Sequence, residues 1–505
     1  MVLHRRCVPL GGVGLSGESA LIEHSIATLH AQLALHALAQ PLAPALLSPG
    51  RRPIGHAELF EIVRSLRSWL AGHGFSPASR IAVVMPSGIE SAVATLAIGA
   101  QATCIPLHPG LPEPELLALL ADARADAVVG LPGDAVPARL ARTLNLAPLD
   151  FDLPHWLARA SEGTADVNAP WPEPSQTAFV LFTSGTTGKA KRVPLGQRQV
   201  VCSARSIARH LALAPADRAL CVMPIHHSHG LVGGLLAPLA AGSSVVCAPA
   251  FDATAFMHWM AEFEPTWYTA APTVHHAIAD QASREGMAVP AHALRLIRSA
   301  SSPMPVALLQ RVEELWGVPV IESYGMTESA TQLASNPLPP APRKPGSVGR
   351  PVGAELRVID GHGHSLPVGQ VGAVVARGPA LFEGYEDNPE ANAEAFRDGW
   401  FHTGDLGRFD ADGDLFLTGR SKEMINRGGE KISPFDVEQA LLRLPGVAQA
   451  AAYPAPHPTL GEDVHAIVVP AAGHTVEGQA LRAALFGQVA DFKIPARIRV
   501  LETIP

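Results

Sequence analysis

Cysteine is scarce in this sequence, and no two cysteines stand at metal-ligand spacing. The 505 residues include five cysteines, which lie far apart and form no C-x-x-C motif. This pattern argues against both a disulfide framework and a thiolate zinc site. We therefore expect a protein of a reducing compartment, the cytoplasm. The Gly-rich N-terminal stretch also lacks the apolar core of a signal peptide, so we assign no targeting signal.

Charged residues are also few, and their signs nearly balance. They make up 17% of the chain against 47% for hydrophobic residues, and 38 Lys and Arg against 46 Asp and Glu give a net charge of −8. This composition excludes a chain that is predominantly disordered, collagen-like or coiled coil. The weak negative charge gives no general attraction to nucleic acid or to an anionic membrane.

A long uninterrupted apolar run is missing as well. The longest uncharged stretch lies between Arg218 and Asp252, but prolines, three histidines and a Gly-Ser-Ser turn interrupt it. Such interruptions are typical of buried strands, helices and turns. We therefore expect no membrane span.

Short apolar runs alternate with helical patterns over most of the chain. Runs such as 81–85, 103–107 and 267–270 have the pattern of buried strands, which predicts an α/β fold with a large N-terminal domain of mostly parallel, helix-wrapped sheets. After about residue 346, short alternating segments with Gly and Asp-Gly turns predict an antiparallel β subdomain. A last αβ region predicts a small α+β C-terminal domain. The expected domains are an N-terminal extension (1–25), the large domain (26–419) and the small domain (420–505).

Two motifs resemble ligand sites but fail in context. Residues 12–17 match the dinucleotide fingerprint G-x-G-x-x-G, yet no strand precedes them and Pro9 stands where it would end. We expect a flexible loop there. The segment from Asp410 resembles a calcium loop, but Leu415 stands where that loop needs Gly. Asp412-Gly413 between two apolar segments instead predicts a β-hairpin.

A loop rich in Gly, Ser, Thr and Lys follows the apolar run 179–182. Its glycines let backbone N–H groups approach an anion, its hydroxyls donate hydrogen bonds and its lysines add positive charge. Phosphate binding is therefore the functional interpretation, and a solvated turn is the alternative. It is not a Walker loop, because only two residues separate Gly185 from Gly188 and Ala190 follows Lys189. The candidate phosphate-binding residues are Thr183, Ser184, Thr186, Thr187 and Lys191.

Four further segments follow this loop in order: Ser-Tyr-Gly-Met-Thr-Glu at 323–328, and the segments 399–405, 417–423 and 426–432. As an ordered set they resemble the adenylate-forming (AMP-binding) superfamily of acyl-CoA synthetases, peptide-synthetase adenylation domains and luciferases. The match covers about residues 26–505. The segments most similar to oxalate-type acyl-CoA synthetases are 334–340, 344–349 and 425–434.

The resemblance implies a two-step reaction with ATP, Mg²⁺ and either CoA or a carrier-bound phosphopantetheine. A small carboxylic acid attacks the α-phosphate of ATP to give an acyl-adenylate and pyrophosphate, and a thiol then takes the acyl group. Glu328 matches the metal ligand, Thr327 a phosphate contact and His227 a side chain beside the reacting carboxylate. The matching nucleotide residues are Ser301, Ser302 and Tyr324 around adenine, with Asp405 and Arg420 at the ribose. Lys422 matches the hinge of a mobile C-terminal domain, and Gly428 and Gly429 match the thiol channel.

This sequence departs from the family pattern at several positions. His226 replaces a usual Phe, and Ala190 and Arg192 replace the common Pro and Gly of the phosphate loop. Thr331 stands where oxalate-type enzymes usually carry His, and no fixed cation is evident nearby. We therefore expect oxalate to be a poor substrate, a small or medium monocarboxylic acid to be preferred, and an amino acid to be less suitable still. The chain also stops before the family's final lysine. We therefore expect either that it is a truncated piece of a longer polypeptide or that its first half-reaction is impaired.

These features predict an acid–thiol ligase of the acyl-CoA synthetase type. The alternative is a loading adenylation domain, excised from an assembly-line protein, that delivers its acyl group to an acyl or peptidyl carrier protein. A third hypothesis, from a different class, is a non-catalytic nucleotide-binding relative.

Overall fold

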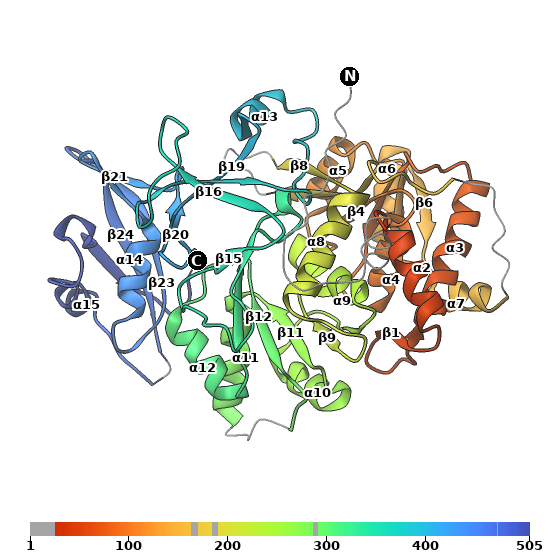
Figure 1. Ribbon diagram of the computed structural model, residues 1–505, viewed down its shortest axis with the longest axis horizontal. Helices are drawn as coiled ribbons and strands as arrows, with labels where there is room; N and C mark the ends of the chain where they lie inside the picture. Colours follow the sequence, from red (N-terminus) through yellow and green to blue (C-terminus); the bar gives the residue numbers. More distant parts are fainter. Residues whose placement is uncertain (1–25, 163–169, 184–189, 286–290, 472, 505) are drawn as a thin grey trace.

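The computed structural model describes residues 26–162, 170–183, 190–285, 291–471 and 473–504 (Figure 1). The dinucleotide-like motif 12–17, the rest of the N-terminal extension, and Ser184, Thr186 and Thr187 of the phosphate loop lie outside the described residues.

A six-stranded sheet with the order β6-β5-β3-β4-β7-β8 forms one side of the large domain. Its strands pair in parallel except β8, which pairs antiparallel with β7. The strands are β3 (Arg80–Val84), β4 (Thr103–Leu107), β5 (Ala127–Gly130), β6 (Ala147–Asp150), β7 (Thr177–Thr183) and β8 (Lys191–Gly196). The helices of this part of the chain are α3 (His56–Gly72), α4 (Ile89–Gly99), α5 (Glu113–Asp122), α6 (Ala135–Leu144) and α7 (Leu153–Glu162).

A nine-stranded sheet with the order β15-β14-β13-β12-β11-β9-β10-β1-β2 forms the second part. The strands from β13 to β1 in that order are parallel, and the outer pairings are antiparallel. The strands are β1 (Pro44–Leu47), β2 (Ile54–Gly55), β9 (Arg218–Cys221), β10 (Ser244–Cys247), β11 (Trp267–Ala270), β12 (Leu296–Ser299), β13 (Val320–Tyr324), β14 (Ala334–Ser335) and β15 (Arg350–Pro351). The helices are α2 (Leu29–Ala39), α8 (Gln197–His210), η1 (His229–Leu236), α9 (Ala237–Ala240), α10 (Ala253–Phe263), α11 (Pro272–Glu285) and α12 (Val306–Trp316).

One hydrophobic core joins the two sheets. Helix α4 contributes Ala92, Val93 and Leu96, each at most 1% exposed, to the same buried cluster as strands of both sheets. A helix that is apolar all round is stable only where protein covers every face. The predicted α/β fold with helix-wrapped, mostly parallel sheets is therefore confirmed. Part of the uncharged stretch after β9 forms η1, a π-helix, where an ordinary helix was expected. Such helices are rare, and many of them lie at functional sites.

The predicted antiparallel β subdomain is also confirmed. Its strands are β16 (Glu355–Ile359), β17 (Gly372–Arg377), β18 (Phe396–Arg397), β19 (Trp400–Phe409) and β20 (Leu415–Arg420), and it carries the helix α13 (Pro389–Ala395).

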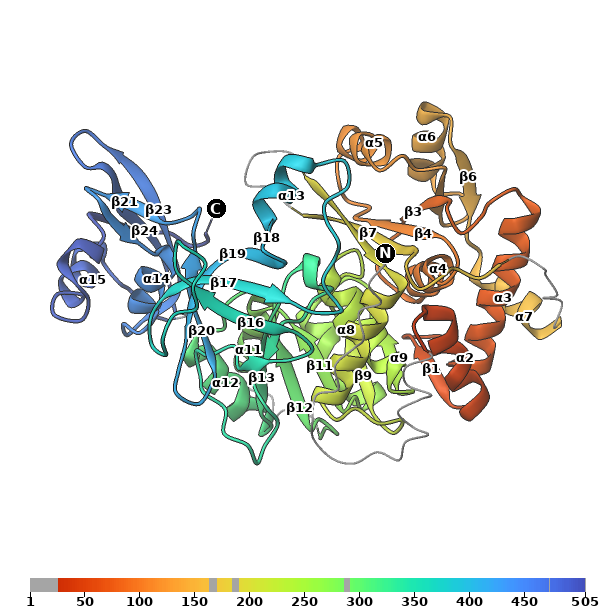
Figure 2. The ribbon, with the colours of Figure 1, turned by 45° about the horizontal axis from the view of Figure 1, so that its top comes forward.

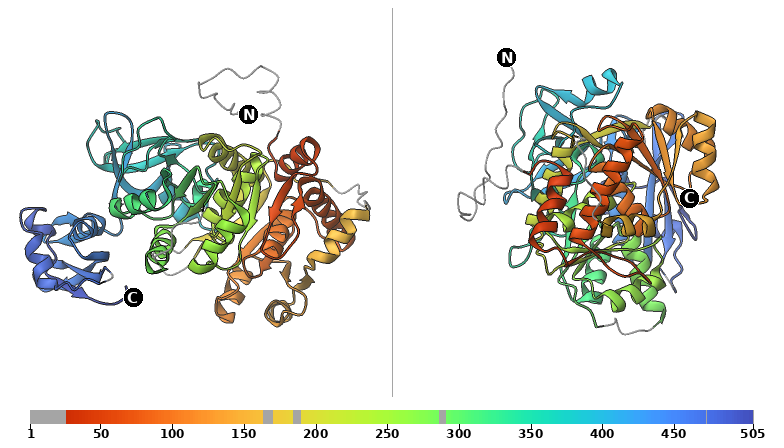
Figure 3. Two further views of the ribbon diagram at one scale, coloured as in Figure 1. Left: turned by 90° about the horizontal axis from the view of Figure 1, so that it is seen from below. Right: turned by 90° about the vertical axis from the view of Figure 1, so that its right-hand side faces the viewer.

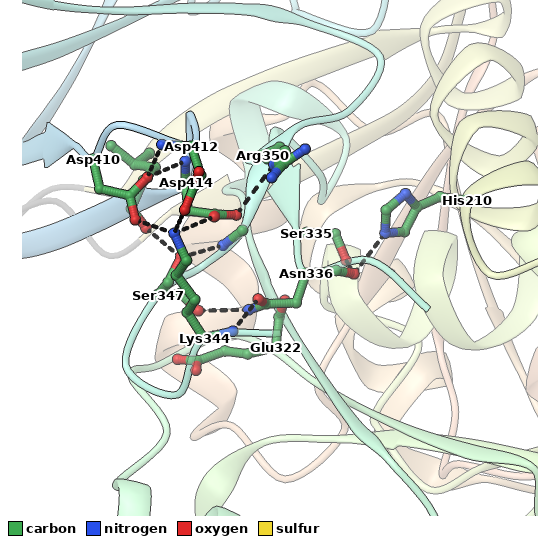
Figure 4. Close-up of polar contacts among 12 residues, drawn as sticks. His210, Glu322, Ser335, Asn336, Lys344, Ser347, Arg350, Asp410, Asp412 and Asp414 are labelled. Carbon is green, nitrogen blue, oxygen red and sulfur yellow. Dashed lines mark hydrogen bonds and ion pairs between the residues drawn. The ribbon is translucent and has the colours of Figure 1, made fainter. Parts of the chain in front are cut away.

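The predicted hairpin joins β19 to β20, and a lysine lies at its turn. The ammonium of Lys344 lies 2.5, 2.6 and 3.1 Å from carboxylate oxygens of Asp410, Asp412 and Asp414 (Figure 4). This contact ties the oxalate-type segment 344–349 to the hairpin. Within the same segment, Ser347 accepts a hydrogen bond from the side chain of Asn336 at its carbonyl oxygen. Three acidic side chains that superficially suggest calcium thus surround a protein cation.

The C-terminal region forms a separate five-stranded sheet with its own apolar core. Figure 3 shows this sheet at one end of the molecule, beyond the β subdomain and far from the N-terminal helices. Strand β20 ends at Arg420, the first residue of the predicted small domain, and the boundary between residues 419 and 420 stays a prediction. The elements are β21 (Ile425–Arg427), β22 (Glu430–Ile432), α14 (Pro434–Leu442), β23 (Val447–His457), β24 (Gly461–Pro470), α15 (Gly478–Ala484), η3 (Asp491–Lys493) and β25 (Arg497–Val500). Across the described part of the chain, no helix combines the length and the apolar character that crossing a bilayer requires.

Candidate active site

The described ends of the phosphate loop lie side by side. Thr183 is the last residue of β7 and Lys191 is the first of β8, and the two are paired across the antiparallel ladder. The ammonium of Lys191 lies 4.6 Å from the ring centre of Tyr385, which is cation–π distance. The fold therefore holds the closing residues of the loop beside Tyr385.

Glu328 lies in η2 (Thr327–Ser329), a short 3₁₀ helix that follows β13. Its side chain is buried, and its Oε1 accepts a hydrogen bond of 2.7 Å from the hydroxyl of Tyr385. Burial and the nearby Glu328 charge raise the pKa of Tyr385, so its phenol remains a donor. Within the described part of the chain, Oε2 of Glu328 has no hydrogen-bond partner. The carboxylate therefore keeps one oxygen for a hard divalent cation, as the proposed metal ligand requires.

Tyr385 is a site residue that the sequence reasoning missed. It joins Lys191 and Glu328, although it lies 57 residues beyond Glu328 in the chain. Neither apolar periodicity nor residue spacing carries a signal for such a long-range contact.

Three predicted nucleotide residues meet from three different strands. Tyr324 at the end of β13 donates a 2.5 Å hydrogen bond to Oδ2 of Asp405 in β19, and Nε of Arg420, at the end of β20, lies 3.2 Å from Oδ1. Asp405 is 6% exposed, and burial raises its pKa. The structure thus brings Tyr324, Asp405 and Arg420 together around one buried carboxylate.

Ser301 and Ser302 are exposed residues in the loop after β12. Ser301 has φ of +80°, a strained conformation for a residue with a side chain, and such strain is often found at functional sites. Its Oγ lies 2.7 Å from Nδ1 of His229, whose Nε2 lies 2.6 Å from Oγ1 of Thr269. His229 therefore supports the predicted adenine segment from the π-helix η1.

The expectation that no fixed cation lies near Thr331 is wrong. Arg298 is completely buried and donates to Oγ1 of Thr269 and to Oε1 of Gln332, both at 3.2 Å. Burial lowers its pKa to about 10, so the guanidinium stays charged at neutral pH. Sequence reasoning missed it because Arg298 lies within an apolar strand pattern.

The predicted catalytic His227 is exposed and lies in a histidine cluster. Its ring centre is 4.4 Å from that of His226, which in turn lies 4.7 Å from the ring of His108. Burial, followed by the two neighbouring histidines, lowers the pKa of His226 to about 3. These imidazoles are therefore largely neutral near pH 7.

The predicted hinge and thiol-channel residues lie outside this cluster of contacts. Lys422 is exposed just after β20, and its ammonium lies 3.7 Å from a carboxylate oxygen of Glu394 in α13. Gly428 and Gly429 form the turn between β21 and β22 with φ of +60° and +99°. Figure 2 shows β21, the strand before this turn, in the C-terminal sheet at the opposite end of the molecule from α3. In the described part of the chain the two glycines make no polar contact with Glu328. The roles of Lys422, Gly428 and Gly429 therefore stay predictions.

Comparison with known proteins agrees with this geometry. A family model described as AMP-binding enzyme matches residues 33–386, and one described as AMP-binding enzyme C-terminal domain matches residues 436–505. An oxalate–CoA ligase of Arabidopsis thaliana is 38% identical over 475 residues, covering 91% of this chain and 92% of that protein. A sulfoacetate–CoA ligase of Cupriavidus necator is 36% identical over 496 residues, 95% of each chain.

A solved structure has the same overall arrangement. O-succinylbenzoate coenzyme A synthetase from Bacillus subtilis, in complex with ATP and magnesium ion, is 28% identical and superposes with a TM-score of 0.82. The superposition covers 94% of this chain and 96% of that chain. Both the large domain and the small C-terminal sheet therefore have counterparts in one known fold.

Proposed function

Because this chain belongs to the family of AMP-binding enzymes, we propose that the cluster around Asp405 and Glu328 is its ATP site. The chain is an acid–thiol ligase of the acyl-CoA synthetase type, near the oxalate–CoA ligases. It activates a carboxylic acid with ATP as an acyl-adenylate and transfers the acyl group to CoA. The finer assignments below are proposals.

One observation carries the nucleotide assignment: the buried Asp405 lies between Tyr324 and Arg420. A carboxylate accepts two hydrogen bonds from vicinal hydroxyls, which suits a ribose, and the tyrosine ring presents an apolar face to adenine. Ser301 and Ser302 are proposed to line the other side of the base. Arg420 can then contact both ribose and phosphate.

A second cluster suits the reacting phosphates. Thr183, Lys191 and the hydroxyls Ser184, Thr186 and Thr187 are proposed to hold the leaving pyrophosphate, with Thr327 at the α-phosphate. Oε2 of Glu328, which has no hydrogen-bond partner among the described residues, suits Mg²⁺, which when bound would offset negative charge on the phosphates. Tyr385 orients that carboxylate by donating to its other oxygen. The magnesium-bound ATP complex of the Bacillus relative supports this assignment.

The remaining roles follow from the family resemblance. His227 is proposed to lie beside the reacting carboxylate, Lys422 to act as the hinge between the domains 26–419 and 420–505, and Gly428 and Gly429 to line the thiol channel. CoA is the favoured acceptor because the relatives are CoA ligases. Among the described residues, no feature favours a carrier protein or a non-catalytic role. A reducing, cytoplasmic setting remains a proposal, consistent with the absence of disulfide bonds at the four described cysteines, Cys104, Cys202, Cys221 and Cys247.

Acid-dependent exchange of labelled pyrophosphate into ATP tests the proposal. Exchange should require a carboxylic acid and Mg²⁺, and Tyr385→Phe should reduce it less than Glu328→Gln. Adding CoA should yield an acyl-CoA, and an excess of carrier protein should not compete. Nucleotide binding without exchange for any acid would favour the non-catalytic hypothesis, and carrier loading in preference to CoA would favour the assembly-line alternative.

A further inference from the structure

Ser203 of α8 is a buried serine that reaches the turn after Glu328. Its side chain is 1% exposed, and its Oγ donates a hydrogen bond of 2.6 Å to the carbonyl oxygen of Ala330, a completely buried residue. A buried carbonyl that loses its partner carries the full cost of having been taken out of water. The Ser203 hydroxyl therefore has a definite structural task beside the proposed metal ligand.

The turn that Ser203 contacts has a strained backbone. Ala330 and Thr331 have φ of +46° and +94°, and a positive φ is exceptional for a β-branched residue such as Thr331. A Cβ atom at Gly325 would lie 2.0 Å from the carbonyl oxygen of Thr331, so the turn folds back tightly onto Gly325. Strained conformations of this kind persist only where the surrounding contacts hold them. The bond from Ser203 is one of these contacts.

A second segment holds Glu328 itself. The backbone N–H of Phe382 donates to the carbonyl oxygen of Glu328 at 2.8 Å, and the hydroxyl of Tyr385 donates to its Oε1. These bonds fix one end of the turn, and the bond from Ser203 fixes the chain two residues further on. Helix α8 directly follows β8, whose first residue is Lys191. Ser203 therefore links the helix after the phosphate loop to the turn that follows Glu328.

We propose that Ser203 is a positioning residue, which holds the turn 328–331 and thereby keeps Glu328 where a Mg²⁺ ligand is needed. This inference rests on the proposed function, in which Glu328 is that ligand. Without the hydroxyl, the Ala330 carbonyl must find another donor or water, and the strained turn loses a contact that holds it. Either change moves Glu328. Mg²⁺ demands near-ideal octahedral geometry, so it tolerates a displaced ligand poorly.

Metal-dependent nucleotide binding tests the inference without relying on catalysis. The probe is an ATP analogue with a methylene group between its α and β phosphorus atoms, which cannot release pyrophosphate. Calorimetry measures its affinity in Mg²⁺ and in a chelator, and the difference reports the metal contact. Ser203→Ala should lower the affinity in Mg²⁺ about tenfold, as is typical when a residue that supports a metal ligand is lost, and leave the affinity in chelator unchanged. The Mg²⁺ concentration for half-maximal pyrophosphate exchange should rise by a similar factor.

Two further variants sharpen the test. Ser203→Cys keeps the shape of the side chain but has only a weak donor, so it should show part of the same loss even if the Ala variant does not fold. The matched control is Ser65→Ala on α3, because Ser65 is also 1% exposed and its Oγ has no hydrogen-bond partner in the described part of the chain. This control should leave both affinities unaltered.

Three outcomes would contradict the inference, and one of them reaches further. Folded Ser203 variants with wild-type affinities in both media would overturn it. An equal loss of affinity in Mg²⁺ and in chelator would also overturn it, because that pattern indicates general damage to the nucleotide site. If Glu328→Gln leaves the effect of Mg²⁺ unchanged, the metal assignment of the proposed function fails, and this inference fails with it.

Discussion

Replacing Arg192 by Gln should weaken both the stability of the large domain and its adenylation step. The Arg192 side chain is 9% exposed, and its guanidinium lies 2.5 Å from Asp122, 3.1 Å from Glu386 and 2.6 Å from Asp387. The family resemblance gives Gly as the common residue at this position, and a Gly could not form these ion pairs.

The magnitude follows from burial and from the partners that remain. Breaking a fully buried ion pair costs about 3–5 kcal/mol, whereas exposed pairs contribute about 0–1 kcal/mol. The carboxylates here are 22–54% exposed, and Glu386 and Asp387 retain their pairs with Arg80 and Arg124. We therefore expect a loss of about 1–3 kcal/mol in the free energy of unfolding.

The effect on chemistry follows from the position of the network. Arg192 directly follows Lys191, and its carbonyl oxygen accepts a hydrogen bond from the backbone N–H of Glu386. Glu386 in turn follows Tyr385, which orients Glu328. If the network loosens, the hydrogen bond from Tyr385 to Glu328 should weaken. We expect the adenylation rate to fall roughly tenfold, which corresponds to the free energy of about one hydrogen bond.

Urea unfolding and pyrophosphate exchange measure the two effects separately. The exposed Arg198→Gln on α8 is the matched control, and a double-mutant cycle with Glu386→Gln isolates the pair energy. A change of less than about 0.5 kcal/mol in the free energy of unfolding for Arg192→Gln, with a wild-type exchange rate, would refute the reasoning.

Three other substitutions test separate parts of the site. Asp405→Ala should weaken ATP binding by about 1.5–3 kcal/mol, because a charged acceptor for the ribose is lost. Calorimetry measures the affinity for ATP, and an unchanged affinity would contradict the assignment. Glu328→Gln should strongly lower the rate of pyrophosphate exchange and hardly change the melting temperature, because a metal ligand acts on the charge of the transition state. An exchange rate equal to that of the wild type would remove Glu328 from the site. Burial raises the pKa of Glu322 from 4.5 to about 8. Between these two pH values the carboxyl is protonated in the folded protein and ionised in the unfolded chain. The free energy of unfolding of the wild type should therefore fall relative to that of Glu322→Gln as the pH rises from about 4.5 to about 8. Urea unfolding at pH 5 and pH 8.5 measures this, and an equal difference between the midpoints of the two proteins at both pH values would refute it.

The buried strands were largely predictable from the sequence. The apolar runs 103–107 and 267–270 are strands β4 and β11 with the same bounds, because a strand buried on both faces needs a short, continuous apolar run. Strand β23 was missed, since its alanines and prolines have low β propensity. It forms an edge of its sheet, where proline is tolerated.

The site was predictable only where motifs are local. Tyr324, Glu328 and Asp405 stand in short ordered segments, and the fold brings Tyr324 and Asp405 into contact. Tyr385 and Arg298 carry no such signal, because their importance arises from contacts with residues distant in sequence. Long-range packing of this kind is decided by the tertiary fold and not by the local pattern.

The pairing of Asp405 has a consequence for turnover. Its two carboxylate oxygens already interact with Tyr324 and Arg420 in the protein alone. A ribose that binds there, as proposed, must exchange these internal bonds for its own and does not simply add new ones. The net gain per contact is then smaller than an unpaired carboxylate would give, and the carboxylate keeps its protein partners when nucleotide leaves. Such an exchange favours prompt release of AMP at the end of each cycle, so that tight recognition during adenylation does not become product inhibition afterwards.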